Sequence, residues 1–203
     1  MKGHRWFAAM YDVINRRAEA RLIGPLRRHL LTDVTGRVLE IGAGTGASFP
    51  YFRAGAWVAA TEPDPFMLRR ARGRAAEAGT RVVLVQCVAE ALPFRDSTFD
   101  EALSALVLCT VGDPARSVVE TRRVLRPGGK LRFIEHVRGE GVVGNVQDAI
   151  SPVWRRVGAG CHPNRRSGEQ IAQAGFAFEE RKEQPLIGGV PLISGVAVAQ
   201  EAS

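Results

Sequence analysis

The sequence predicts an α/β fold: a three-layer sandwich built on a seven-stranded, mostly parallel sheet whose C-terminal strands form an antiparallel hairpin. Three observations lead to this prediction. A short apolar run at 36–41 passes directly into a glycine-rich turn at 42–46. Strand and helix patterns then alternate up to residue 135, and two strand-like runs near the C-terminus have no helix between them. Alternation of this kind produces a parallel sheet with helices on both faces.

The first two thirds of the chain supply the parallel strands. Residues 6–31 carry apolar side chains at helical spacing, and Gly24-Pro25 should divide them into two helices. Residues 36–41 form the first strand, and a helix should follow the glycine turn. The other elements expected here are strands at 57–61, at 82–85, within 99–108 and at 130–135, a helix from Pro65 to Ala78, and a helix capped by Asp113 that runs from Pro114 to Leu125.

The C-terminal third departs from the alternation. Residues 137–166 are rich in Gly, Pro and Arg, and we expect an insertion there rather than a sheet element. Ser167 and Gln170 match a capping box for a helix that ends at Gly175. Residues 176–184 and 190–200 should pair as a hairpin, which completes the seven strands.

Length and composition are those of one globular domain: 203 residues, 45% apolar and 24% charged. No run approaches the roughly 20 apolar residues of a membrane span, and the N-terminal residues lack a secretory apolar core, so the expected location is cytoplasmic. The net charge of +7 comes from scattered basic residues, which argues against a nucleic-acid partner. One basic helix face should be solvated, with at most peripheral contact to an anionic membrane; it comprises Arg16, Arg17, Arg21, Arg27 and Arg28.

The cysteines and histidines show no ligand spacing. Cys87, Cys109 and Cys161 are odd in number and far apart, without a C-x-x-C pair. They indicate neither a disulfide framework nor a tetrahedral metal site. The sequence therefore predicts no metal.

The glycine-rich turn predicts a nucleotide-like cofactor. Gly42, Gly44 and Gly46 let the backbone approach a ligand closely, where a Cβ would clash. Rossmann-like folds bind cofactors in this way at the carboxyl ends of their strands. With Ala47, and with Glu62 about 20 residues on, the turn also matches the loose dinucleotide pattern G-x-G-x-x-A.

Two details favour S-adenosyl-L-methionine over a dinucleotide. The third glycine comes at Gly46, and Glu40 ends the strand just before the turn. A carboxylate there is unfavourable beside a pyrophosphate but suits an ammonium group, and S-adenosylmethionine has an amino-acid head and no phosphate. We expect this cofactor, with S-adenosyl-L-homocysteine as the product. An NAD-dependent oxidoreductase and a catalytically silent binding module remain alternatives.

The sequence resembles the class I S-adenosylmethionine-dependent methyltransferases with a methyltransferase type 11 domain. The matching motifs are Leu39-Glu40-Ile41-Gly42-Ala43-Gly44-Thr45-Gly46, Glu62-Pro63-Asp64 followed by Met67, Ala89-Glu90-Ala91-Leu92-Pro93-Phe94, Phe99-Asp100, and Val124-Leu125-Arg126-Pro127-Gly128-Gly129. The resemblance implies that residues 1–203 form a single methyltransferase domain. Residues 1–31 would then be lid helices over the cofactor edge, and 137–166 an insertion on the substrate side.

The resemblance also assigns cofactor-binding residues. Glu40 would orient the ammonium group, and Glu62 would bind the ribose hydroxyls. Val88 stands where the family usually has an acidic residue that holds the adenine amino group, so the backbone of Ala89 or the side chain of Glu90 would substitute. The full expected set is Tyr11, which would close over the cofactor, Glu40, Gly42, Ala43, Gly44, Gly46, Glu62, Pro63, Met67, Val88, Ala89, Glu90 and Ala105.

A narrower resemblance points to the acceptor. The narrower resemblance is to the thiol S-methyltransferases of the methyltransferase-like group, and it rests on Tyr11-Asp12, Leu106-Val107-Leu108-Cys109, Ile134-Glu135-His136-Val137, Pro152-Val153-Trp154 and Gly158 to Cys161. This resemblance implies a small lipophilic thiol as the acceptor. A phospholipid amine, a hydroxyl or a carbon nucleophile are the alternatives, and the protein would be a monomer or a homodimer.

One candidate for proton transfer ends the fifth strand. A thiol with a pKa near 8.5 is already a few per cent ionised at neutral pH, whereas a hydroxyl would need a committed base. We hypothesise that His136 accepts or relays the acceptor's proton, while Glu135 orients it or stays structural. In the alternative interpretation, His136 only packs beneath the insertion.

Overall fold

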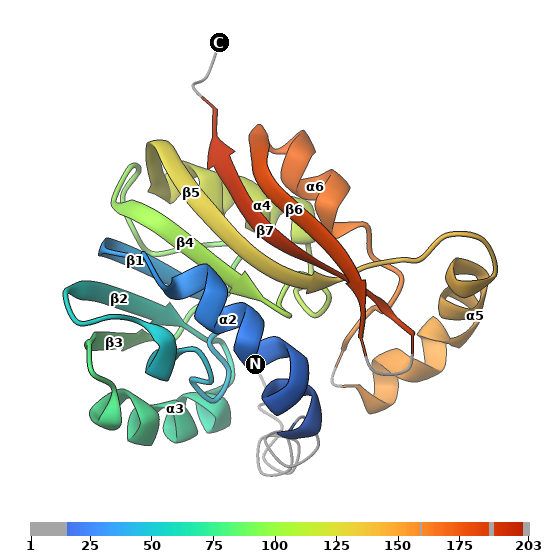
Figure 1. Cartoon of the computed structure of the whole chain (residues 1–203), viewed down its shortest axis with the longest axis horizontal. Helices are drawn as coiled ribbons and strands as arrows, with labels where there is room; N and C mark the ends of the chain where they lie inside the picture. The colour runs from blue at the N-terminus through green and yellow to red at the C-terminus, as the bar shows by residue number, and fades with distance from the viewer. Residues whose placement is uncertain (1–15, 159, 187–188, 201–203) are drawn as a thin grey trace.

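A single sheet of seven strands organises the computed structural model, which describes residues 16–158, 160–186 and 189–200 (Figure 1). The strands are β1 (Gly36–Ile41), β2 (Ala56–Thr61), β3 (Arg81–Val85), β4 (Phe99–Ala105), β5 (Leu125–His136), β6 (Phe176–Pro185) and β7 (Pro191–Ala199). Their order is β3-β2-β1-β4-β5-β7-β6. β1 to β5 are parallel, and β7 runs antiparallel between β5 and β6. The predicted fold class is confirmed.

Helices cover both faces of the sheet. They are η1 (Glu19–Ile23), α2 (Gly24–Leu31), the 3-10 turn η2 (Phe49–Tyr51), α3 (Pro65–Glu77), α4 (Pro114–Val124), α5 (Gly141–Val157) and α6 (Ser167–Gln173). α2 and α3 pack on one face, and α4 and α6 pack on the other, while α5 stands apart beyond the carboxyl end of β5 (Figure 1). The sheet and its two helical layers form the expected three-layer sandwich.

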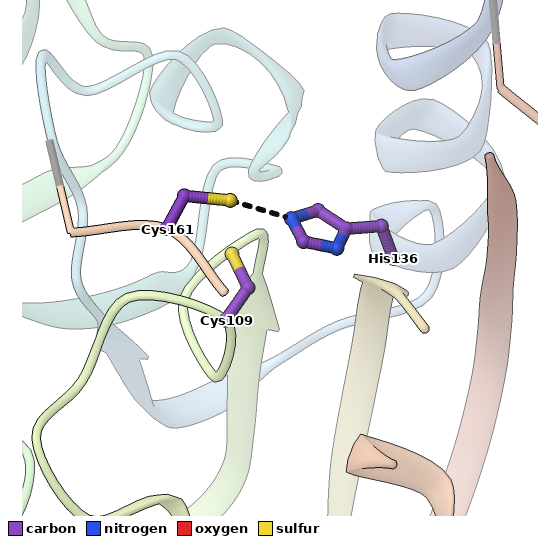
Figure 2. Close-up of side chains that lie close together, drawn as sticks. All are labelled: Cys109, His136 and Cys161. Atoms are coloured by element: carbon purple, nitrogen blue, oxygen red, sulfur yellow. Dashed lines mark hydrogen bonds between the residues drawn. The ribbon is translucent and has the colours of Figure 1, made fainter. Parts of the chain in front are cut away.

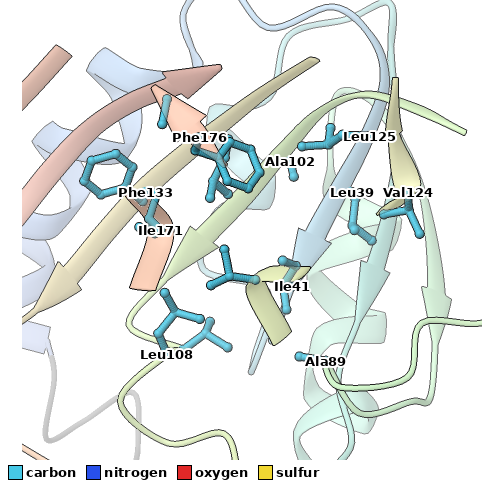
Figure 3. Packing of buried hydrophobic residues seen from close by; sticks show 14 of the residues in the cluster. Leu39, Ile41, Ala89, Ala102, Leu108, Val124, Leu125, Phe133, Ile171 and Phe176 are labelled. Atoms are coloured by element: carbon cyan, nitrogen blue, oxygen red, sulfur yellow. The ribbon is translucent and has the colours of Figure 1, made fainter. Parts of the chain in front are cut away.

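Apolar side chains alternate between the two faces and build the core on each side. Leu39 and Ile41 of β1, Phe133 of β5 and Ile171 of α6 belong to one buried cluster (Figure 3). On the opposite face, Leu30 of α2 packs against residues of β5 and β7. Full burial of one such side chain contributes about 1.5–3 kcal/mol.

The chain reverses direction across the sheet between β1 and β4. From β1 it continues to β2 and β3 on one side, and β4 then starts the other half. In open α/β sheets, ligands bind outside the carboxyl ends of the strands at such a switch point. The glycine turn after β1 and the loop after β4 meet there.

The predicted helix break at Gly24-Pro25 is wrong. Residues 23 and 24 keep helical backbone angles, and the chain passes from the wide π-turn η1 directly into α2. The amide of Gly24 bonds to the carbonyl of Glu19, five residues back. This wider turn accommodates Pro25, which has no amide of its own to donate. The buried Leu30 and Leu31 make α2 a core layer, and the lid remains a prediction for residues before 16, which lie outside the described residues.

The helix predicted after the glycine turn is also wrong. Turns over residues 44–48 lead only into the short η2, because positive φ angles at Gly44 and Gly46 and the missing amide of Pro50 prevent a regular helix. The segment Pro127-Gly128-Gly129 lies within β5 as a bulge, since Leu125 pairs with Phe99 and Lys130 already pairs with Glu101.

Two expectations for the C-terminal third also change. Residues 141–157 of the expected insertion form the 17-residue helix α5. Ser167 is not an N-cap: α6 begins with it, Arg166 precedes it, and its buried hydroxyl makes no capping bond. The hairpin of β6 and β7 is confirmed.

Candidate active site

The glycine turn forms an open cradle at the carboxyl end of β1. Gly42 and Gly44 have φ angles of +58° and +57°, which L side chains rarely adopt. A Cβ on Gly42 would lie 2.7 Å from the side chain of Val107, whereas a Cβ on Gly44 would meet none of the described residues within 4 Å. The turn is therefore packed on one side and faces free space on the other.

Glu62 braces this turn against β2. Its Oε2 accepts a hydrogen bond from the Gly44 amide at 3.0 Å, and its Oε1 accepts one from the Asp64 amide at 2.9 Å. The amide of Ala43 donates to the Thr61 carbonyl at 2.8 Å, which ties the same segments together. Burial raises the pKa of Glu62 above its usual value, although these backbone donors oppose the shift.

Glu40 holds a buried carboxylate beneath the cradle. Its side chain is hydrogen-bonded to Ser48, and Arg27 donates to the Ser48 hydroxyl and, at 3.1 Å, to Glu19. Burial raises the pKa of Glu40 to about 7. Its second oxygen, Oε2, is buried and has no hydrogen-bond partner among the described residues. Arg27 is thus buried, so the expectation that it belongs to a solvated basic face is wrong.

These features fit S-adenosylmethionine better than a dinucleotide. An unpartnered carboxylate oxygen next to an open glycine turn suits an ammonium group. A pyrophosphate is normally held at the N-terminus of the helix that follows such a turn. Here the turn leads into η2, of only three residues.

The remaining expected cofactor residues lie around the same edge. Asp64, which follows Pro63, caps α3 with its side chain, and Met67 near the start of that helix is buried. After β3, Ala89 is buried and Val88 is half-buried. Ala105 is the last residue of β4. Tyr11 lies outside the described residues.

Glu90, the expected substitute partner for adenine, is anchored to the loop before α4. Its Oε1 accepts hydrogen bonds from the amides of Gly112 and Asp113 at 2.7 and 3.0 Å. The carboxylate therefore helps to position the start of α4. Its contact with adenine stays a prediction.

Glu135 organises the loop after β4. Its Oε1 accepts hydrogen bonds from the Ser104 hydroxyl at 2.7 Å and from the amides of Val107 and Leu108 at 3.1 and 3.2 Å. Between these donors, Leu106 has a φ of +61°, a strained angle for a bulky residue. Burial raises the pKa of Glu135, and the three donors oppose that shift. Successive strand residues point to opposite faces, so Glu135 supports this loop rather than bonding to His136.

His136 meets two cysteines that the sequence places far away. Its Nε2 lies 3.1 Å from the Cys161 sulfur, and the Cys109 sulfur completes the group in Figure 2. The hydrogen bond from Cys109, followed by the contact with His136, lowers the pKa of Cys161 to about 4. Burial alone would lower the pKa of His136, but its bond to Cys161 raises it. The hydrogen bond to Cys161 and burial raise the pKa of Cys109.

Sequence reasoning missed this cluster. Its members come from the loop after β4, the end of β5 and the loop after α5, and Cys161 is 25 residues from His136. No spacing rule detects such a group. The one available signal was that Cys109 and His136 both follow the carboxyl ends of neighbouring parallel strands.

A cavity of about 930 Å³ lies against η1 and α2, and most of its wall residues fall within 16–32. Its walls include Ile23, Ala47, Leu106 and Leu186, together with basic side chains of α2. It therefore joins the turn after β1, the loop after β4 and the hairpin loop in one space with an apolar part.

Comparisons with known proteins agree with this architecture. Residues 39–133 match the methyltransferase domain family. Thiol S-methyltransferase TMT1B of Homo sapiens is 32% identical over 164 residues, which cover 76% of this chain and 66% of that protein. Phosphatidylethanolamine N-methyltransferase of Cereibacter sphaeroides is 37% identical over 119 residues, which cover 57% of this chain and 59% of that protein. The chain thus spans less than two thirds of the length of either relative.

The solved structures share the fold. The crystal structure of a SAM-dependent methyltransferase from Thermotoga maritima superposes with a TM-score of 0.70 at 23% identity, over 97% of this chain and 98% of that one. Because the family match includes the glycine turn, Glu62 and the strands that carry the site, this chain belongs to the class I S-adenosylmethionine-dependent methyltransferases.

Proposed function

We propose that this protein transfers the methyl group of S-adenosylmethionine to a small lipophilic thiol. The observation that carries the proposal is the buried Glu40 oxygen, just before the glycine turn, that has no hydrogen-bond partner among the described residues and suits the ammonium end of the methyl donor. The likeness to TMT1B supports the thiol.

The chain's residues would act mainly by positioning. Methyl transfer from a sulfonium is an in-line displacement, so aligning the acceptor with the methyl carbon supplies much of the acceleration. Glu62 would hold the glycine turn and bind the ribose, and Glu135 would fix the loop after β4. His136, at the carboxyl end of β5, would relay the thiol proton through its bond to the Cys161 sulfur in the metal-free protein.

A panel of acceptors tests the substrate class. A labelled methyl donor is offered with an alkyl thiol, an aryl thiol, an amine and an alcohol at one pH, and we expect thioether products from both thiols. Methylation of the amine alone would favour the phospholipid amine alternative, which the likeness to the Cereibacter sphaeroides enzyme supports. His136→Ala should change the dependence of turnover on pH, with the exposed His29→Ala as the matched control.

Titration calorimetry tests the cofactor independently of turnover. S-adenosylhomocysteine should bind with a dissociation constant near micromolar, about −8 kcal/mol, and NAD should give no heat. Binding of NAD but not of S-adenosylhomocysteine would favour the oxidoreductase. Binding of S-adenosylhomocysteine without methylation of any acceptor would favour the silent binding module.

Helix α5 supports peripheral contact with an anionic membrane. Its polar side is attached to the protein, where Gln147 bonds to the backbone of residues 137, 139 and 163. Its apolar side is exposed, with Val142, Val146 and Val153 at 77, 52 and 63% exposure. Exposed arginines at 155 and 156 follow in the last turn. A helix with this arrangement can lie on a bilayer surface, and no helix among the described residues is long and apolar enough to span one.

A further inference from the structure

Three soft metal-ligand atoms converge at the acceptor edge of the sheet. The Cys109 sulfur, a ring nitrogen of His136 and the Cys161 sulfur all lie within 4.8 Å of one another. In Figure 2 the Nε2 of His136 faces both sulfurs. No disulfide joins the two cysteines.

The backbone holds the three positions in place. The amide of His162 donates to the Cys109 carbonyl at 2.8 Å, and the amide of Cys161 donates to the Gly158 carbonyl at 3.0 Å. His136 belongs to β5 and is paired in register with β7. These backbone hydrogen bonds therefore help to fix the positions of the three ligand residues.

The donor set fits zinc, one of the metals that thiolate and imidazole ligands bind well. Thiolate and imidazole are the preferred ligands of Zn²⁺ and disfavour Mg²⁺ and Ca²⁺. At Zn–S and Zn–N bond lengths of about 2.3 and 2.0 Å, tetrahedral ligand atoms lie about 3.5–3.8 Å apart. The group needs only small adjustments to reach this geometry.

The site has three candidate protein ligands, which leaves one position of a tetrahedral metal for another ligand. Within the described part of the chain, the cluster contains three candidate ligands, not four. Three ligands with an open position are the arrangement of catalytic zinc, whereas structural zinc has four. The cluster also lies beside the methyl-donor cradle, since Val107, two residues before Cys109, packs against Gly42.

We propose that Cys109, His136 and Cys161 bind one Zn²⁺ ion whose fourth position takes the sulfur of the acceptor thiol. This inference rests on the proposed function. The thiol loses its proton to solvent when it coordinates, and a sulfur electron pair then forms the new S–CH₃ bond. The CH₃–S⁺ bond of the donor breaks, and its electron pair stays on the sulfur of S-adenosylhomocysteine. With the ion bound, His136 is a ligand rather than a base.

The first test measures metal binding without any methyl donor. The full chain, stripped of metal and reduced, is titrated with Co²⁺, which replaces zinc and reports thiolate ligands by absorption. We expect one ion per chain, displaced by Zn²⁺. Loss of an outer-shell partner alone weakens metal binding about 10- to 100-fold, so Cys161→Ser and His136→Gln should weaken it at least about 100-fold. Cys87→Ser and His29→Gln are the matched controls and should bind as the wild type does.

The metal titration still tests the proposal if one of the variants fails to fold. Cys161 is half-buried and should tolerate serine, while the fully buried Cys109 is the greater risk, so circular dichroism is recorded for each variant. Absence of one-to-one Co²⁺ binding by the reduced wild-type chain would overturn the proposal. Equal binding by the wild type and by Cys161→Ser would do the same.

The second test concerns the open position. With S-adenosylhomocysteine present, so that no turnover occurs, an aryl thiol should shift the cobalt spectrum and the matching alcohol should not. A spectrum unmoved by the thiol would overturn the acceptor role. Thiol methylation that persists after complete metal removal would refute this inference and leave the proposed function standing. A metal site without S-adenosylhomocysteine binding would instead refute the proposed function.

Discussion

The buried carboxylate of Glu40 should link cofactor binding to a proton. Burial raises its pKa from 4.5 to about 7, which corresponds to about 3 kcal/mol against the charged form in the donor-free protein. An ammonium group next to the unpartnered Oε2 would favour the charged form. The substitution Glu40→Gln keeps the shape of the side chain and removes the charge.

The sign of the effect on stability follows from the direction of the shift. A carboxyl group whose pKa is raised on folding contributes its full stability below pH 4.5 and loses it as the pH rises through about 7. The free energy of unfolding of the wild type, relative to Glu40→Gln, should therefore fall by about 3 kcal/mol between pH 4.5 and pH 8. Urea unfolding at several pH values measures this difference.

Cofactor binding should become stronger as the pH rises, because it favours the charged form of Glu40, whereas folding favours the protonated form. About half of Glu40 is protonated at pH 7 in the donor-free protein, so binding of S-adenosylhomocysteine should release about half a proton. Calorimetry in two buffers of different ionisation enthalpy detects this release. In Glu40→Gln the release should disappear and affinity should fall about 10- to 100-fold, as expected when a charged hydrogen bond worth about 1.5–3 kcal/mol is lost.

Glu179→Gln is the matched control, because it removes a carboxylate from the exposed ion pair with Lys130. It should leave both the pH dependence and the affinity unchanged. The reasoning is refuted if Glu40→Gln binds S-adenosylhomocysteine as tightly as the wild type, or if proton release persists in that variant.

Three further predictions follow from the described contacts. Glu135→Gln should lower the free energy of unfolding by about 2 kcal/mol, because a buried charged acceptor of three hydrogen bonds is replaced by a neutral one. Chemical denaturation measures this loss, and an unchanged midpoint would contradict the role of Glu135 in supporting the loop after β4. Gly44→Ala and Gly128→Ala should each cost about 1 kcal/mol, because both sites have a positive φ and free space for a Cβ. Calorimetry should show weaker binding of S-adenosylhomocysteine for Gly44→Ala only. Val146→Glu should weaken sedimentation with anionic vesicles about fivefold or more, whereas Val119→Glu on α4, also 55% exposed before the change, should not.

The donor half of the site was readable from the sequence because its signals are local. The glycine turn, Glu40 before it and Glu62 after β2 each lie within a few residues of a strand end. Strand patterns identified the seven-stranded sheet, and parallel strands bring their carboxyl ends to one edge. The local motif and the resemblance to the methyltransferase family were sufficient for this part.

The ends of helices and the burial of their side chains could be predicted less well from the sequence, because tertiary contacts outweighed the local preferences of the residues. Gly24-Pro25 usually ends a helix, but the π-turn at Glu19–Ile23 carries the chain through it. Arg27 lies on a basic helix and was expected in water. It is buried because Ser48 and Glu19, from two other turns of the chain, accept its donors.

The sequence by itself determined the fold class, the methyl-donor turn and the two carboxylates beside it, since adjacent residues and strand order specify them. Only the tertiary structure decided how Cys109, His136 and Cys161 meet. Their approach depends on the path of α5 and on the hydrogen bonds that return the following loop to the Cys109 carbonyl. A contact between residues 25 or more positions apart leaves no periodic pattern along the chain, so it becomes visible only when the packed loops fix both partners in space.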